Sequence, residues 1–123
     1  MKLTLSPLIL LMSLFVSLSI YSQTEDAYKV ADNYTKKEVD ITMRDGIKLH
    51  TTIYSPKDTS KKYPIIMQRT PYSSQPYGQD QFKSKIGPNE FLMKEGNIIV
   101  YQDVRGRWMS EGVYDNMRAY IPK

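Results

Sequence analysis

Apolar and polar residues alternate along two neighbouring segments in the first half of the chain. The two-residue period runs through residues 39–44 and again through residues 47–54, and this period is typical of strands with one apolar face. Asp45 and Gly46 stand between them, and both residue types tolerate the positive φ of a type I′ turn. The pattern predicts an antiparallel hairpin with His50 on its polar side. Its apolar side would carry Val39, Ile41, Met43, Ile47, Leu49, Thr51 and Ile53.

Two further segments are apolar without alternation. Residues 63–68 contain Ile65-Ile66-Met67, and residues 98–101 read Ile-Ile-Val-Tyr. Continuous apolar runs are typical of strands covered on both faces. A short helix is expected between them, over residues 91–95, because Pro88-Asn89-Glu90 provides a start signal and Gly96 a stop signal.

The order of elements predicts an α/β fold: an antiparallel hairpin, ended by Pro56, that leads into a parallel sheet. Residues 75–87 are polar and rich in Gly and Pro, which predicts a surface loop. One short helix cannot cover two apolar strands on both faces, although parallel sheets need such cover. We therefore expect residues 38–123 to be an incomplete, truncated portion of a domain.

The first residues have the pattern of a secretory signal peptide. Lys2 is followed by an almost wholly apolar stretch from Leu8 to Ile20, and small residues precede the acidic Glu25. This order predicts a signal over residues 1–22 with cleavage near Ser22, and export to the periplasm or the extracellular space. The stretch is short for a spanning helix, so contact with a membrane is expected only through this signal. Residues 23–37 read as a lead-in segment.

Composition excludes several functions. The 123 residues carry a formal charge of +4, but the basic residues are spread along the chain, which argues against nucleic-acid binding. There is no cysteine and only one histidine, so neither disulfides nor a metal site is expected. We expect no cofactor, and the oligomeric state is open.

No complete catalytic triad can be assembled from the sequence. The nearest string to a Gly-x-Ser-x-Gly nucleophile elbow surrounds Ser110, but it begins with Trp108 and no apolar strand runs directly into it. His50 is the only possible base in the sequence. We therefore interpret Ser110 as a loop residue and His50 as a surface or edge residue of its strand.

Chemistry is expected where the two apolar strands end. Ligands bind at the carboxyl ends of strands in open parallel sheets, and the segments 69–72 and 103–106 follow the two strands. Pro71 restricts its own backbone and that of Thr70, which gives Tyr72 a defined direction. A phenol is a hydrogen-bond donor at neutral pH, and a fixed donor suits an oxyanion hole. The alternative is a turn tyrosine whose ring only packs.

Three motifs in order carry a family resemblance. They are MRDGIKLHTTIYSP over residues 43–56, PIIMQRTPY over residues 64–72 and FLMKEGNIIVYQDVRGRWMSEG over residues 91–112. Together they resemble the start of the alpha-amino acid ester hydrolase and cocaine esterase family, which includes Xaa-Pro dipeptidyl-peptidase-like hydrolases. The likeness covers roughly residues 39–118.

The resemblance implies an α/β-hydrolase fold and serine-hydrolase chemistry on a small ester or amide substrate. It implies that Tyr72 donates its hydroxyl to the oxyanion, and that the serine, acid and histidine of the triad come later than this chain reaches. The matched motif residues look more architectural than catalytic. They are Asp45, Gly46, Arg69, Pro71, Asp103, Arg105, Gly106, Ser110 and Gly112.

A second hypothesis remains open at this point. The chain could be a complete small secreted β-rich binding module without catalysis, which would account for its ten tyrosines and its export signal. It would not account for two strands that are apolar on both faces with one helix to cover them.

Overall fold

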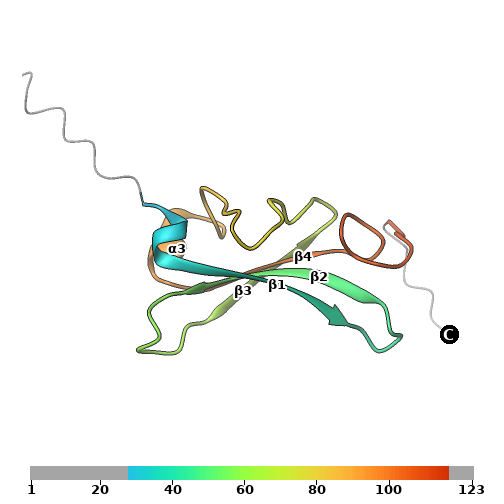
Figure 1. The fold of residues 1–123 in the computed structure, drawn as a ribbon, viewed down its shortest axis with the longest axis horizontal. Coiled ribbons are helices and arrows are strands. Elements are labelled where there is room, and N and C mark those ends of the chain that lie inside the picture. Colours follow the sequence, from blue (N-terminus) through green and yellow to red (C-terminus); the bar gives the residue numbers. More distant parts are fainter. Residues whose placement is uncertain (1–27, 117–123) are drawn as a thin grey trace, which may run out of the picture.

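The computed structural model describes residues 28–116, so the expected signal peptide lies outside the described residues. Its strands form one four-stranded sheet with the order β1-β2-β4-β3. The elements are α2 (Val30–Asn33), β1 (Tyr34–Thr42), β2 (Lys48–Pro56), β3 (Ile65–Thr70), α3 (Glu90–Lys94) and β4 (Ile98–Asp103), as Figure 1 shows.

The predicted hairpin is present, but its turn differs from the prediction. Strands β1 and β2 pair antiparallel from Tyr34↔Pro56 to Thr42↔Lys48, so β1 starts inside the expected lead-in segment. The amide of Met43 donates to the carbonyl of Ile47 at 2.8 Å, which leaves a three-residue loop. Only its last residue, Gly46, has a positive φ, at 83°. The type I′ turn was therefore wrong, because three-residue loops need only one left-handed residue.

The parallel pair predicted from the two apolar runs is confirmed. Strands β3 and β4 pair parallel, from Ile65↔Ile98 to Thr70↔Asp103, and α3 lies in the connection between them. The side chain of Asn89 accepts a hydrogen bond from the amide of Leu92 at 2.9 Å, which caps the first turn of α3. β4 lies between β2 and β3 and runs antiparallel to β2.

The face of the sheet that looked polar in sequence is the covered one. Residues 71–89 cross this face as an irregular loop, above the sheet in Figure 1, and Ile86 of this loop is only 1% exposed. The expected surface loop is therefore a covering layer. Both helices also supply core residues. The buried cluster consists of Val30, Tyr34, Tyr54, Ile86, Met93 and Ile99.

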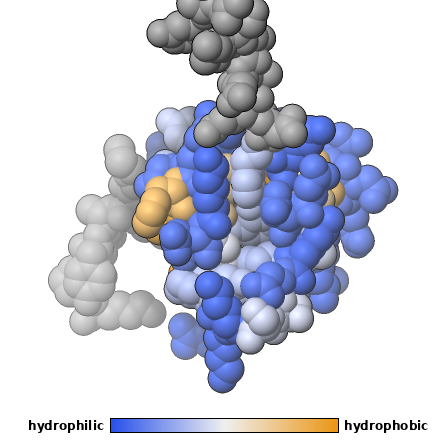
Figure 2. Space-filling model, turned by 90° about the vertical axis from the view of Figure 1, so that its left-hand side faces the viewer, coloured by the Kyte–Doolittle hydropathy of each residue, from blue (hydrophilic) through white to orange (hydrophobic). Residues whose placement is uncertain are grey.

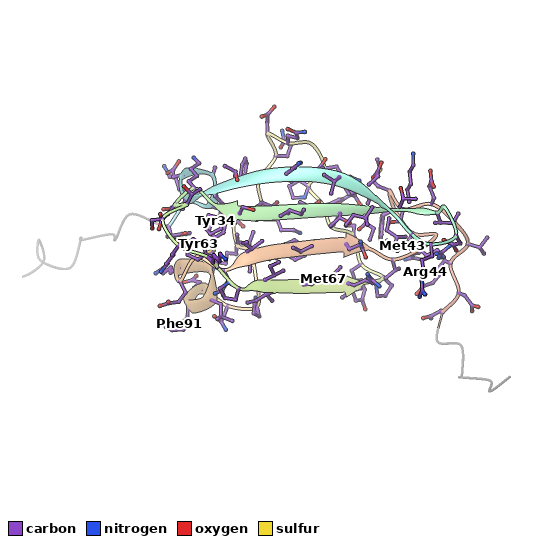
Figure 3. The ribbon with its side chains drawn as sticks, turned by 90° about the horizontal axis from the view of Figure 1, so that it is seen from below. Tyr34, Met43, Arg44, Tyr63, Met67 and Phe91 are labelled. Carbon is purple, nitrogen blue, oxygen red and sulfur yellow. The ribbon has the colours of Figure 1, made fainter. Side chains whose placement is uncertain are left out.

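His50 was expected at a surface or edge, and this was wrong. Its cross-strand register places it on the covered face of β2, opposite Asp40 of β1, and it is 8% exposed. On the apolar face Leu49 and Thr51 are buried, but other large hydrophobic residues are exposed. Ile41, Ile65 and Met67 are exposed by 40%, 67% and 48%, and Figure 3 views this face with Met67 on β3. Within residues 28–116, β3 is thus not covered on both faces, because its residues are exposed or half-buried.

The two ends of the sheet differ in what they present. Figure 2 faces the end that carries α2 and α3, and its visible surface is mostly hydrophilic with a small hydrophobic patch at the side. The carboxyl ends of β3 and β4 lie at the opposite end, next to residues 104–116 in Figure 1.

Candidate functional site

The two segments expected to carry chemistry lie side by side. Thr70 ends β3 directly opposite Asp103, which ends β4. Tyr72 and the loop after Asp103 therefore share one edge of the sheet, as the parallel arrangement predicts. Arg69 points to the other face, in the row that it shares with Gln102, and is exposed. It therefore stands apart from the groups gathered around Asp103.

Tyr72 projects into solvent from this edge. It is 79% exposed, so its ring is not packed against residues 28–116. Its amide and carbonyl both contact the hydroxyl of Thr70, at 3.3 and 3.4 Å. Among the described residues nothing hydrogen-bonds the Tyr72 hydroxyl, which is thus available to a group outside them. A cleft of about 220 Å³ opens beside it, lined in part by Gln68, Ser73 and Ser74.

Asp103 carries a buried carboxylate at the end of β4, opposite Thr70. It is 0% exposed. Its Oδ1 accepts a hydrogen bond from the amide of Ser74 at 2.7 Å, and its Oδ2 accepts from the Tyr77 hydroxyl at 2.8 Å and from the amide of Met109 at 3.3 Å. Burial, and then the bond to Asp103, raise the pKa of Tyr77 to about 12. Tyr77 therefore remains a donor at neutral pH.

Trp108 holds the residue that precedes Tyr72, whereas Asp103 holds Ser74, which follows it. Its indole Nε1 donates to the carbonyl oxygen of Pro71 at 2.9 Å. Its φ is 54°, the left-handed region that a bulky residue rarely adopts. Sequence reasoning missed this role, since Trp108 was considered only as the residue that breaks the elbow motif. Neither the backbone conformation nor the contact with Pro71 leaves a signal in sequence pattern.

The edge of the sheet where β3 and β4 end, with Tyr72, is called the rim below. The remaining motif residues build the loop behind it. The Arg105 guanidinium meets the Asp45 carboxylate with contacts of 2.8 and 3.1 Å, and its hydrogen bond lowers the pKa of Asp45. Gly106 has a φ of 69°, and a Cβ there would lie 2.1 Å from the amide nitrogen of Tyr114. Gly112 has a φ of 94° and packs on the Arg105 side chain. These residues join the β1–β2 turn to the loop after β4.

Ser110 and His50 meet, but not as nucleophile and base. The buried Ser110 hydroxyl donates to the backbone carbonyl of Asp103 at 2.7 Å and accepts from the backbone amide of His50 at 2.9 Å. The His50 ring instead contacts Asp40, with Nδ1 at 3.1 Å from its carboxylate. Ser110 thus fastens the end of β4 to β2, in keeping with a loop residue.

A buried ionic cluster, not foreseen from sequence, anchors the covering loop to β1. The Lys36 ammonium contacts the Glu38 carboxylate at 2.8 Å and donates to the carbonyls of Pro76 and Gly78, at 2.5 and 2.8 Å. Glu38 accepts from the amide of Gly78 at 2.9 Å. Strand β1 therefore holds the loop a few residues beyond Tyr72.

Residues 28–116 show neither a metal site nor a membrane-spanning helix. No three His, Asp or Glu side chains lie close enough together to hold a metal ion. No helix in this part of the chain has the length and hydropathy needed to cross a membrane.

Comparison with known proteins places the chain in a family. Residues 45–120 match the family described as X-Pro dipeptidyl-peptidase (S15 family). Over 89 residues the chain is 33% identical to a cocaine esterase of Rhodococcus sp. (strain MB1 Bresler). That match covers 71% of this chain and 14% of the esterase.

Two solved structures show the same relationship. One is a selenomethionine-labelled alpha-amino acid ester hydrolase, with a TM-score of 0.56 and 37% identity. The other is an aminopeptidase from the marine sediment archaeon Thaumarchaeota archaeon, with a TM-score of 0.58 and 35% identity. Each match covers 77% of this chain and 16% of the solved chain.

The chain therefore spans only a small part of the length of the relatives it matches. Its mixed four-stranded sheet corresponds to a part of those larger hydrolases. The family match covers more than half of the chain and agrees with the three motifs that carried the resemblance. This protein belongs to the S15 family of X-Pro dipeptidyl-peptidases and related esterases.

Proposed function

We propose that this chain is the N-terminal part of an exported serine hydrolase that cleaves small esters or amides, built on an α/β-hydrolase fold. In it, Tyr72 donates its hydroxyl to the oxyanion that forms during acyl transfer. The proposal is supported by the match to a peptidase family and by the similarity to an esterase and to an amino acid ester hydrolase.

The observation that carries the proposal is the place of Tyr72. It follows the last residue of a parallel strand, its hydroxyl is free of bonds to residues 28–116, and its backbone neighbours are fixed. An oxyanion donor must be held in place before the charge develops, because a donor that has to reorganise loses its advantage. A neutral phenol on a stiff strand exit meets that requirement without adding a charge to the site.

The other catalytic groups are proposed to come from the rest of the enzyme. The chain spans 14% of the related esterase, which leaves room for a serine, a histidine and an acid in the remainder. The exposed apolar face, with Ile41, Ile65 and Met67, would then pack against that remainder. Residues 1–22 would direct export, and N-terminal sequencing of the exported enzyme would show whether it begins at Gln23.

The test is the substitution Tyr72→Phe in the complete enzyme that carries this segment. We expect kcat for 4-nitrophenyl acetate to fall by about 10²-fold, because one oxyanion donor is lost. Covalent labelling by a fluorophosphonate probe should become correspondingly slower, because the phosphonyl oxygen uses the same donor.

Tyr63→Phe is the matched control. Tyr63 precedes β3 at the other end of the sheet from the rim, as Figure 3 shows, and its hydroxyl donates to Asp58 at 2.5 Å. We expect its kcat to match that of the unsubstituted enzyme. Equal rates for the Tyr72→Phe enzyme and the control would refute the oxyanion role. Absence of fluorophosphonate labelling in the unsubstituted enzyme would refute serine-hydrolase chemistry.

A further inference from the structure

We propose that Asp103 and Trp108 together act as positioning residues for Tyr72. They fix the segment from Pro71 to Ser74 at both of its ends, so that the Tyr72 hydroxyl keeps one place at the rim. This inference rests on the proposed function, because it concerns the site at which Tyr72 would act.

The first element is the choice of groups that Asp103 binds. A buried carboxylate needs several donors to offset its loss of hydration. Asp103 takes one of them from the amide of Ser74, two residues after Tyr72, and another from the hydroxyl of Tyr77. Within residues 28–116 no basic side chain forms a salt bridge with it. Its negative charge therefore serves to hold the segment that contains Tyr72, and charge-assisted bonds are the stronger kind.

The second element connects Asp103 to Trp108. Oδ2 of Asp103 also accepts from the amide of Met109, the residue that follows Trp108. Trp108 in turn holds the carbonyl of Pro71, the residue that precedes Tyr72. Tyr72 is thus bracketed by a fixed carbonyl on one side and a fixed amide two residues later, and both constraints lead back to one carboxylate.

The third element is the backbone of Trp108. A φ of 54° in a non-glycine residue costs free energy and persists only where surrounding contacts enforce it. Three contacts surround this residue: its indole donates to Pro71, the next amide donates to Asp103, and the amide of Ser110 closes a turn over it on the carbonyl of Arg107. Trp108 is nevertheless 52% exposed, so core packing does not explain this conformation.

Asp103 acts through its neighbours and not on a substrate. Both oxygens already accept hydrogen bonds, and the side chain has no exposed surface. If Asp103 only stabilised the fold, its substitution would lower kcat by the same factor whether or not residue 72 has a hydroxyl. A positioning role is visible only when that hydroxyl is present, and this difference defines the experiment.

The test is a double-mutant cycle with Asp103→Asn and Tyr72→Phe in the complete enzyme, followed by 4-nitrophenyl acetate hydrolysis. The amide introduced by Asp103→Asn would turn its own NH₂ group toward one of the present donors, so at least one bond must be lost. We expect Asp103→Asn to lower kcat by at least about 10-fold with KM nearly unchanged, because small misplacements of a catalytic group are costly. In the Tyr72→Phe background we expect no further loss.

Asp58→Asn is the matched control, since Asp58 also accepts a tyrosine hydroxyl, that of Tyr63, but far from the rim. It should leave kcat unchanged in both backgrounds. If Asp103→Asn yields no folded enzyme, Trp108→Phe decides the question, because it keeps an aromatic ring and removes the indole N–H that holds Pro71. It should lower kcat several-fold when Tyr72 is present and have no such effect in the Tyr72→Phe background.

The outcomes separate this inference from the proposed function. Equal losses of kcat with and without the Tyr72 hydroxyl would overturn the positioning role and leave the oxyanion role standing. An unchanged kcat in Tyr72→Phe alone would overturn both.

Discussion

The ammonium of Lys36 lies 2.8 Å from the carboxylate of Glu38 on the covered face of β1, and the Lys36 side chain has no exposed surface. The two residues are two apart in a strand, so they point to the same side of the sheet. Together they bind the covering loop through Pro76 and Gly78. The sheet thus holds this loop by buried charge as well as by apolar contact.

The first prediction concerns Lys36→Met. This substitution keeps most of the buried volume but leaves the Glu38 carboxylate and two carbonyls without their shared donor. Removing one partner of a buried ion pair typically costs about 3–5 kcal/mol. We expect the free energy of unfolding, measured by urea denaturation, to fall by that order. Lys37→Met is the control, because Lys37 is the next residue and is exposed on the opposite face. Its effect should stay within about 0.5 kcal/mol, and a comparable loss in both variants would contradict the buried-pair explanation.

The second prediction is a loss of stability in acid that depends on Glu38. Burial acts to raise the pKa of this carboxyl, but its bonds with Lys36 and the amide of Gly78 outweigh burial, so that its pKa is lowered from 4.5. A lowered pKa means that the stabilisation is present above the unfolded value and is lost as pH falls through the folded one. We expect the urea midpoint to drop as pH falls below about 4.5, and to drop less in Glu38→Gln.

Glu90→Gln provides the control for this pH dependence. Glu90 also forms an ion pair, with Lys85 at 2.6 Å, but both side chains are more than half exposed, and such pairs are screened by water. Its acid response should follow that of the unsubstituted protein. An acid response of Glu38→Gln equal to that of Glu90→Gln would show that Glu38 does not cause the loss.

The third prediction compares two glycines with similar backbone conformations. Gly46 and Gly106 have φ values of 83° and 69°, but a Cβ at Gly46 meets no atom within 4 Å. At Gly106 it would overlap the backbone of Val113 and Tyr114, at 2.4 and 2.1 Å. Gly46→Ala should therefore cost only the left-handed strain, about 1–2 kcal/mol. Gly106→Ala should cost at least about 2 kcal/mol more in thermal or urea unfolding, and equal losses would contradict a close approach at Gly106.

The sequence pattern was sufficient to locate the strands but not to orient the sheet. The period of two between residues 39 and 54 separates two faces correctly, and the hairpin and the parallel pair are both present. It could not tell which face is covered, since that depends on residues 71–89, which have no period of their own. Tyr34 and Tyr54 also make the covered face look polar in sequence, although both are buried. A tyrosine can bury its ring while its hydroxyl finds a partner, as Tyr34 does with the carbonyl of Met93 at 2.6 Å.

The sequence pattern could also locate the rim, but it could not predict the hydrogen bonds within the rim. The ends of β3 and β4 follow from the two apolar runs, and the resemblance singled out Tyr72 and Asp103. The hydrogen bonds of Asp103 reach Ser74 and Tyr77, 29 and 26 residues away in sequence. Such long-range contacts, and the left-handed backbone of Trp108, depend on the assembled fold and leave no local signature.

The strand order has a consequence for the time at which the sheet can form during synthesis. β1 and β2 are neighbours in both chain and sheet, so they can pair as soon as both have left the ribosome. β3 is made next but has no partner, because its only neighbour among the described strands is β4, and Ile65 must wait for Ile98. Pairing across such a separation carries a loop-closure cost before it gains any contact. For that interval the apolar, β-prone residues 65–67 are unpaired on both edges, which is the kind of exposed strand that another chain can pair with.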